Sequence, residues 1–468
     1  MIMPKNGADM FTKGIPSGKK YILFSFLLTS ALLFGSCGKR SAESAASSSI
    51  TVTDSNSDLS SPESTAPVIT MPENTPPVTL SPLPSPFPTP LPTFTPTPSP
   101  LPEVLKDCEQ AVLTSDSGAL NSKLFDDNFM TFGTLTRGSH VKLTSNRPVD
   151  KLYIVWNDHP LSCSLYTSAG SVEIGSTGFM HELVCLPEAT TSISLNAPSE
   201  DIGVCDIYAF TEGKLPDWVQ VWEPPHETAD ILLFSTHSDD EFIFFGGIIP
   251  SYGKEKGYRV QLAYMTSPYI GSERYRCHEL LNGLWTAGVT HYPVTTGARD
   301  WGQKTLEAAK NYYGYDNFMK FQVEQIRRFR PLVVLGHDLN GEYGHTAHML
   351  GALTLKDAVP AAADSSKYPE SAKLYGIWDT PKFYLHLYGK NPTVLDYETP
   401  LKAFGGKTAF QVAMESYAKH LSQQRWSFTV YTFGSPVDSH RFGLVRSLVG
   451  DDIKKKDLME NISPEAFR

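Results

Sequence analysis

Two polar clusters carry the side chains that could do chemistry in this chain of 468 residues. Residues 237–241 read His-Ser-Asp-Asp-Glu, and residues 341–348 read Gly-Glu-Tyr-Gly-His-Thr-Ala-His. Histidine nitrogens and carboxylate oxygens are donors that zinc accepts, and a catalytic zinc ion takes three protein ligands with a further position left open. Together the two clusters can supply two histidines and one carboxylate, with a second carboxylate and another histidine beside them.

The predicted metal ligands are His237, Asp240 and His348. With these three residues assigned, Asp239 has no metal bond and can accept a proton from water as that water attacks a carbonyl carbon. Tyr343 and His345 lie in the second cluster, where they can stabilise an oxyanion or protonate a departing amine. The pattern therefore predicts a metal-dependent hydrolase. Zinc is the expected ion, and this ligand set does not exclude iron(II).

Each cluster taken alone has an ordinary structural explanation. A His-x-x-Asp segment after a strand commonly caps a helix, and acidic residues are favoured at a helix N-terminus. A His-x-x-His segment at the start of a helix is more often a solvated face than a pair of ligands. The co-occurrence of complementary ligands after two buried strands is what favours the metal site.

The elements that must position these clusters are two strands. Residues 231–234 and 332–335 are uninterrupted apolar runs, which predict parallel strands buried on both faces. In open α/β sheets, ligands bind at the carboxyl ends of such strands, where both polar clusters fall. Further runs of strand type and helix type alternate at 260–265, 275–287, 306–329 and 346–358. This alternation predicts an α/β domain over residues 225–468, Rossmann-like, with three layers and a largely parallel sheet.

Several motifs of this region resemble those of a known family. They are the strand followed by His-x-Asp-Asp-Glu, then Gly246-Gly247, then Arg276-x-x-Glu279, and finally Gly-Glu-Tyr-Gly-His-x-x-His. Together they resemble the PIG-L/LmbE-like N-acetylglucosaminide deacetylases from about residue 230 to the C-terminus.

The resemblance implies the same site roles as the residue types do. It implies zinc bound by His237, Asp240 and His348, a base at Asp239, and transition-state stabilisation by Tyr343 and His345. It also implies that Arg276 and Asp300 contact the sugar, with Asp300 matched only by its position after the third strand.

Two segments depart from the family pattern. Ser238 stands where the family has proline, and Thr346-Ala347 stands where the family has proline and aspartate. None of these positions is a predicted ligand, so the predicted metal site is unchanged. The departures bear on loop rigidity, on the orientation of His345 and on substrate preference.

An earlier folded region is predicted over residues 106–224. Short β-rich runs occur at 140–143, 152–156, 191–195 and 207–210, separated by turn residues, and this pattern is typical of a β-sandwich. Residues 124–128 and the closing strand at 204–208 resemble discoidin-type (galactose-binding-like) modules. Such modules either bind sugars at their loop tips or pack against an enzyme, and both roles stay open.

The N-terminal residues resemble a bacterial lipoprotein signal peptide. Three lysines (Lys13, Lys19 and Lys20) precede an uncharged apolar run at 21–34, which leads to Gly35-Ser36-Cys37. This predicts a signal peptide at residues 1–36 and lipidation at Cys37, the alternative being an ordinary secretory signal. Residues 37–105 are rich in Ser, Thr and Pro, which predicts a disordered tether. We therefore expect a lipid-anchored protein on the extracellular face of a bacterial membrane.

Charge and cysteine content limit the partners. The formal net charge of −10 argues against a nucleic-acid partner. Cys108, Cys163, Cys185 and Cys205 all fall in the first region, and in an exported protein they could be oxidised in any of three pairings. Cys277 is predicted to be a buried helix residue.

The function that these features predict is removal of acetyl from an N-acetylated amino sugar or glycoconjugate by a zinc-dependent hydrolase at the cell surface. One alternative is an amidase that acts on another acyl-amine conjugate with the same residues, and the sequence does not separate it from the first. A second alternative is a non-catalytic sugar-binding lipoprotein on a degenerate enzyme scaffold. That alternative predicts damaged metal ligands, whereas all three are present.

Overall fold

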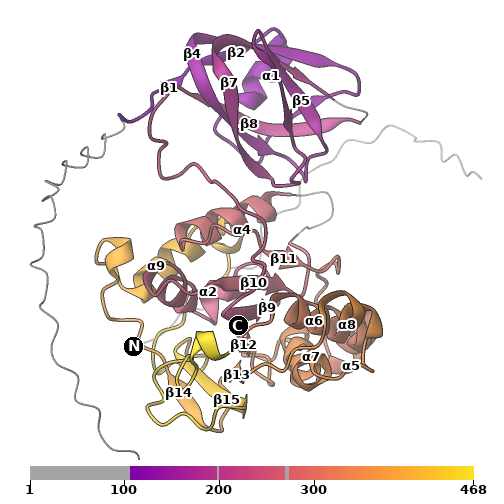
Figure 1. The fold of residues 1–468 in the computed structure, drawn as a ribbon, viewed down its shortest axis with the longest axis vertical. Coiled ribbons are helices and arrows are strands. Elements are labelled where there is room, and N and C mark those ends of the chain that lie inside the picture. The colour runs from indigo at the N-terminus through magenta and orange to yellow at the C-terminus, as the bar shows by residue number, and fades with distance from the viewer. Residues whose placement is uncertain (1–105, 198–199, 269–273, 468) are drawn as a thin grey trace, which may run out of the picture. The chain divides into compact units, whose positions relative to one another are not determined.

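The structure is a computed structural model that describes residues 106–197, 200–268 and 274–467 (Figure 1). The predicted signal peptide at 1–36 and the whole predicted tether at 37–105, which begins with Cys37, lie outside the described residues. Within the described ranges, no helix is both long enough and apolar enough to span a membrane.

The first region is built from antiparallel strands. Its elements are β1 (Gln110–Ala111), β2 (Leu113–Ser115), α1 (Gly118–Leu124), β3 (Gly133–Leu135), β4 (His140–Trp156), β5 (Cys163–Thr167), β6 (Gly170–Ile174), β7 (His181–Asn196) and β8 (Ile202–Phe210). The strands form one eight-stranded sheet in the order β1-β8-β4-β7-β5-β6, with β2 paired to β4 and β3 paired to β8. Every predicted β-rich run lies in one of these strands, and the resemblance to discoidin-type modules stays a prediction.

Strand β4 joins two runs that the sequence predicts as separate strands. The runs at 140–143 and 152–156 belong to a single strand whose register against β7 shifts between Thr144 and Val149. Pro148 lies in that interval and has no N–H to donate to the ladder. A local bulge accommodates the proline, so the strand continues in an extended conformation where the turn-forming residues predict a break.

The second region alternates strands and helices. Its strands are β9 (Ile231–Ser235), β10 (Val260–Tyr264), β11 (Val294–Thr295), β12 (Val333–Gly336), β13 (Lys382–His386), β14 (Pro392–Val394) and β15 (Arg441–Ser447). Its α-helices are α2 (Asp240–Ile243), α3 (Ile248–Pro250), α4 (Tyr275–Thr286), α5 (Leu306–Ala309), α6 (Tyr315–Phe329), α7 (Thr346–Ala362), α8 (Pro369–Tyr375) and α9 (Ala409–Tyr417). Short turns of π- or 3-10-helix are η1 (Ser251–Glu255), η2 (Lys310–Gly314), η3 (Lys402–Phe404), η4 (Leu421–Gln423) and η5 (Pro464–Phe467).

The seven strands form one mixed sheet in the order β11-β10-β9-β12-β13-β15-β14. The pairings from β11 to β13 are all parallel, and β15 pairs antiparallel with both β13 and β14. The sheet is therefore largely parallel, as the alternation predicts.

Helices cover both faces of this sheet, which gives three layers (Figure 1). In β9, Ile231 and Leu233 belong to a core that also contains side chains of α2, α4 and α9. Leu232 and Phe234 belong to a second core that contains side chains of α6 and α7. Because alternate side chains of a strand point to opposite faces, a strand covered on both faces must be apolar at every position, which explains the unbroken run.

Two features of the helical layer differ from or extend the prediction. The helix predicted at 306–329 is interrupted, because Gly314 adopts a φ of 80° where η2 ends and α6 begins.

The C-terminal end of α7 is held by the fully buried side chain of Arg327. It donates to the carbonyl oxygens of Ala361, Ala362, Asp364, Lys367 and Tyr368. These contacts satisfy carbonyls at the helix end and fix the helix that carries His348.

The cysteines of the described residues are all free thiols. Of the possibilities that the sequence leaves open for Cys108, Cys163, Cys185 and Cys205, the structure has the free thiols and no disulfide among them. Burial raises the pKa of both Cys163 and Cys205 to about 12, so these thiols stay protonated and behave as core residues. Cys277 is buried in α4, as predicted.

Candidate metal and catalytic site

The predicted site residues gather at the carboxyl edge of the parallel strands. His237, Asp239 and Asp240 follow β9, and Asp240 is the first residue of α2. Asp300 follows β11, and His345 caps the start of α7 after β12. Because the carboxyl ends of parallel strands meet at one edge, segments far apart in sequence come together there.

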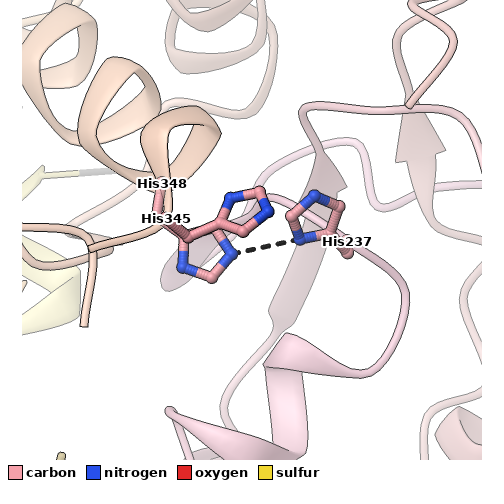
Figure 2. A group of neighbouring side chains, drawn as sticks. All are labelled: His237, His345 and His348. Atoms are coloured by element: carbon pink, nitrogen blue, oxygen red, sulfur yellow. Dashed lines mark hydrogen bonds between the residues drawn. The ribbon is translucent and has the colours of Figure 1, made fainter. Parts of the chain in front are cut away.

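Three ligand atoms of the predicted metal set converge. His237 Nδ1 lies 2.9 Å from Asp240 Oδ2, and His348 Nε2 lies 3.1 Å from that same oxygen and 3.1 Å from His237 Nδ1 (Figure 2). In a tetrahedral zinc site with metal–ligand bonds of about 2.0–2.2 Å, ligand atoms lie about 3.3–3.6 Å apart. The triangle is slightly smaller than this, and the donor types are those that zinc prefers. The residues therefore fit a zinc ion.

Two other groups of side chains near this triangle have the right atoms for a metal. One joins His345 to His237 and His348, and the other joins His337 to Asp240 and His348. His337 Nε2 already accepts a 2.9 Å hydrogen bond from the Thr236 N–H, so its lone pair is in use. His345 instead lines the pocket, with its ring 4.7 Å from that of His237 (Figure 2).

Asp239 is a buried carboxylate with a cationic partner. The residue precedes α2 and its backbone has a φ of 144°. Its Oδ1 lies 3.5 Å from Nη2 of Arg276. The same Arg276 nitrogen donates a 2.6 Å hydrogen bond to the Ser238 carbonyl oxygen. Burial raises the pKa of Asp239 to about 7, against the opposing charge of Arg276. A carboxyl group with a pKa near neutrality is suited to general-base catalysis.

Asp300 contacts the side of His237 that faces away from Asp240. Its Oδ1 lies 3.4 Å from His237 Nε2, and Tyr313 donates a 3.2 Å hydrogen bond to the same oxygen. Burial acts to raise the pKa of Asp300, but the neighbouring His237 holds it below its usual value. Asp300 thus remains an anion that orients the His237 ring, and it also lines the pocket where the sugar contact is predicted.

A pocket of about 130 Å³ opens over this cluster. Seven of the eight predicted site residues line it, namely His237, Asp239, Asp240, Arg276, Asp300, Tyr343 and His345. The eighth, His348, is fully buried. Ile243, Phe244, Gln423 and Phe428 complete the lining and were not predicted.

The two remaining polar residues of the pocket are uncharged near neutral pH. Burial lowers the pKa of His345 to about 3, with the neighbouring His237 and His348 acting in the same direction. Burial also raises the pKa of Tyr343 above its ordinary value. Both side chains can therefore donate a hydrogen bond from a neutral group. His345 is therefore not an imidazolium that could protonate a departing amine in the resting protein.

The sequence reasoning missed a set of buried groups behind the ligands: His337, Glu342 and His386. All three side chains are at most 2% exposed, and Glu342 contacts His337, His386 and the ligand His348. The sequence does hold a signal for two of them, because His337 directly follows β12 and His386 is the last residue of β13, so both stand where strands end at the site. Glu342 belongs to the second cluster but was not assigned a role.

No family model matches the chain. A 1D-myo-inositol 2-acetamido-2-deoxy-alpha-D-glucopyranoside deacetylase from Rhodococcus erythropolis is 32% identical over 179 residues, which is 33% of this chain and 59% of the relative. The protein of the same name from Nocardia farcinica is 31% identical over 183 residues, which is 34% of this chain and 57% of the relative. Among solved structures, N,N'-diacetylchitobiose deacetylase from Pyrococcus horikoshii is 18% identical with a TM-score of 0.31, covering 42% of this chain and 72% of that one.

The chain spans less than two thirds of the length of these two curated relatives. Over the matched segment, the chain is therefore similar to part of proteins that are named as deacetylases of a 2-acetamido-2-deoxy-glucopyranoside.

Proposed function

We propose that this protein is a zinc-dependent N-deacetylase that removes acetyl from an N-acetylated amino sugar or a glycan containing one. The observation that carries the proposal is the convergence of His237 Nδ1, Asp240 Oδ2 and His348 Nε2 within 3.1 Å of one another. The same cluster forms the wall of a pocket that holds a carboxylate of raised pKa and two neutral hydrogen-bond donors.

His237, Asp240 and His348 would hold the metal ion. When bound, zinc lowers the pKa of water and polarises a carbonyl oxygen. Asp239 lines the pocket next to these ligands and accepts a proton on its carboxylate as water attacks the acetamide carbon. The Tyr343 hydroxyl donates a hydrogen bond to the oxyanion that develops on the former carbonyl.

The proton for the departing amine comes from Asp239 in this proposal. A pKa of about 7 allows Asp239 to take up a proton in the first step and to release it in the second. The pKa of His345, lowered to about 3, makes an imidazolium at that position costly. His345 therefore acts as a neutral hydrogen-bond donor to the reacting groups.

Arg276 and Asp300 are proposed to contact the sugar in the pocket that both line. In the structure Arg276 also pairs with Asp239, so it holds the base in place as well. Arg276 therefore links substrate binding to the position of the base.

The decisive experiment measures acetate release from a panel of N-acetylated amino sugars and their oligomers. The parent should be active, should lose activity with a chelator, and should regain it when zinc is restored. Iron(II) is tested in parallel, since it accepts the same ligands. If the parent releases acetate from none of these sugars, the deacetylase proposal is wrong, and the result favours the non-catalytic sugar-binding alternative.

We also propose that Cys37 anchors the protein by lipid to the extracellular face of a bacterial membrane, with residues 37–105 as the tether. The Gly-Ser-Cys sequence after an apolar run supports the anchor. The proline content of the tether supports an extended spacer that would give the enzyme reach toward a surface glycan. The antiparallel sheet of the first region would then position the enzyme or bind the same glycan.

A further inference from the structure

A single carboxylate, Glu342, joins the histidines behind the candidate metal site. Its Oε2 lies 2.7 Å from His348 Nδ1. Its Oε1 lies 3.0 Å from His337 Nδ1, 2.9 Å from His386 Nδ1 and 3.0 Å from the backbone nitrogen of Asp338. The side chain is 0% exposed. Oε1 thus receives three contacts and Oε2 one, and Oε2 serves His348 alone among these groups.

These contacts fix which ring nitrogens of His337 and His348 face the carboxylate. His337 Nε2 accepts from the Thr236 N–H at 2.9 Å, so the proton of His337 must be on Nδ1, facing Glu342. His348 Nδ1 also faces the carboxylate and must donate to it. Nε2 is therefore the His348 nitrogen that faces Asp240 and His237 and that would take a metal ion.

The backbone of Glu342 is in a strained conformation. Its φ is 54°, in the left-handed region that most residues other than glycine avoid. Strain of this kind persists where the surrounding structure holds the residue in place, and it concentrates at functional sites. Here the four hydrogen bonds to the carboxylate provide that hold.

We propose that Glu342 is a positioning residue that keeps His348 in the Nδ1-protonated tautomer and thereby makes His348 Nε2 available as a metal ligand. This inference rests on the metal site of the proposed function. It assigns to Glu342 a role that its own side chain performs without touching the metal or the substrate. Carboxylates on the outer nitrogen of a metal-binding histidine orient the ring and fix its tautomer in other metal sites.

The variant Glu342→Gln tests this role because it conserves shape while changing one acceptor into a donor. The amide oxygen should occupy the Oε1 position, where three donors meet, and the NH₂ group should occupy the Oε2 position facing His348. His348 Nδ1 would then have to accept a hydrogen bond, which moves its proton to Nε2. The lone pair that faces the metal position is lost in that tautomer.

We expect the zinc dissociation constant of Glu342→Gln to rise about 10- to 100-fold, the usual loss when an outer-shell partner of a metal ligand is removed. Competition with a chromogenic chelator measures it. Nitrogen NMR of the imidazole rings in zinc-loaded protein should show the His348 proton on Nδ1 in the parent, and the variant at the same zinc concentration should lose that signal as it loses zinc. The matched control is Glu279→Gln, a buried carboxylate bonded to Ser422 and to no imidazole, which should bind zinc as the parent does.

A dissociation constant for Glu342→Gln within threefold of the parent overturns the proposal, and so does an equal loss in Glu279→Gln. If Glu342→Gln does not fold, Glu342→Asp replaces it, because aspartate tolerates left-handed backbone and only withdraws the carboxylate. Parent-like zinc binding in folded Glu342→Asp, with the carboxylate out of reach of His348, would also overturn it. A parent that binds no zinc overturns the proposed function and this inference together, whereas a parent that binds zinc beside an unaffected Glu342→Gln overturns this inference alone.

Discussion

Replacing Asp239 with asparagine separates general-base catalysis from metal binding. The side chain is 8% exposed, lines the pocket and is not one of the three converging ligands. Asparagine has the same shape but cannot accept the proton that leaves the attacking water. We therefore expect Asp239→Asn to retain zinc and to lose most of its turnover.

The size of the loss follows from the other bases in the pocket. His345, another base that lines the pocket, has a pKa lowered to about 3, against about 7 for Asp239. A base weaker by about four pKa units, with a Brønsted coefficient of about 0.5, removes the proton about 10²-fold more slowly. Loss of a positioned general base usually costs about 10²- to 10⁴-fold, so kcat should fall at least about 10²-fold, or about 2.7 kcal/mol of barrier.

The assay is steady-state acetate release, paired with metal analysis of the same preparations. Asp206→Asn is the matched control, because burial raises the pKa of Asp206 to about 7 and it lies in β8, away from the predicted site residues in sequence. That variant should keep parent-like kcat and zinc content. If Asp239→Asn keeps more than a tenth of the parent kcat with zinc bound, Asp239 is not the base.

Four further outcomes are expected. His237→Ala combined with His348→Ala should abolish tight zinc binding, and full zinc content by metal analysis would refute the ligand set. Tyr343→Phe should lower kcat about 10²-fold at unchanged zinc content, and an unchanged kcat would remove Tyr343 from oxyanion stabilisation. Cys37→Ser should release the protein from membranes or leave it unprocessed, whereas parent-like fractionation would exclude lipidation there. Burial lowers the pKa of His278 to about 3, so below pH 6.5 this histidine takes up a proton in the unfolded chain but stays neutral in the folded protein. Its contribution should lower the free energy of unfolding by about 1.4 kcal/mol for each pH unit below 6.5, and the decrease should be less steep in His278→Asn.

The sequence is most informative where a strand is buried on both faces. The unbroken apolar runs before His237 and before the second cluster correspond to β9 and β12, which pair in parallel. The polar residues directly after them then have to lie at one sheet edge. This is why residues separated by 111 positions, His237 and His348, could be placed in one site from sequence alone.

The contacts that the sequence does not reveal depend on how strands pair. His386 reaches Glu342 because β13 lies beside β12, and no local pattern encodes that order. Asp300 follows β11, a strand of two residues that is too short for a periodic signal. The joining of two predicted strands into β4 is a similar case, since a bulge at Pro148 depends on the partner strand.

Ser238 and Thr346 stand where the PIG-L/LmbE-like family that this sequence resembles has proline. At both positions a hydrogen bond restrains the backbone, as the rigid ring of proline would. Ser238 lacks the fixed φ of proline, but its carbonyl oxygen accepts a 2.6 Å hydrogen bond from Arg276. Thr346 is the first residue of α7, a position where proline is favoured, and its hydroxyl donates a 3.0 Å hydrogen bond to the carbonyl of Gln303. The first contact fixes the loop that carries the base, and the second ties the His345 end of α7 to the segment that follows Asp300. Loop order at this site therefore depends on side chains that also line or border the pocket, so we infer that substitutions at Arg276 alter substrate binding and base position together.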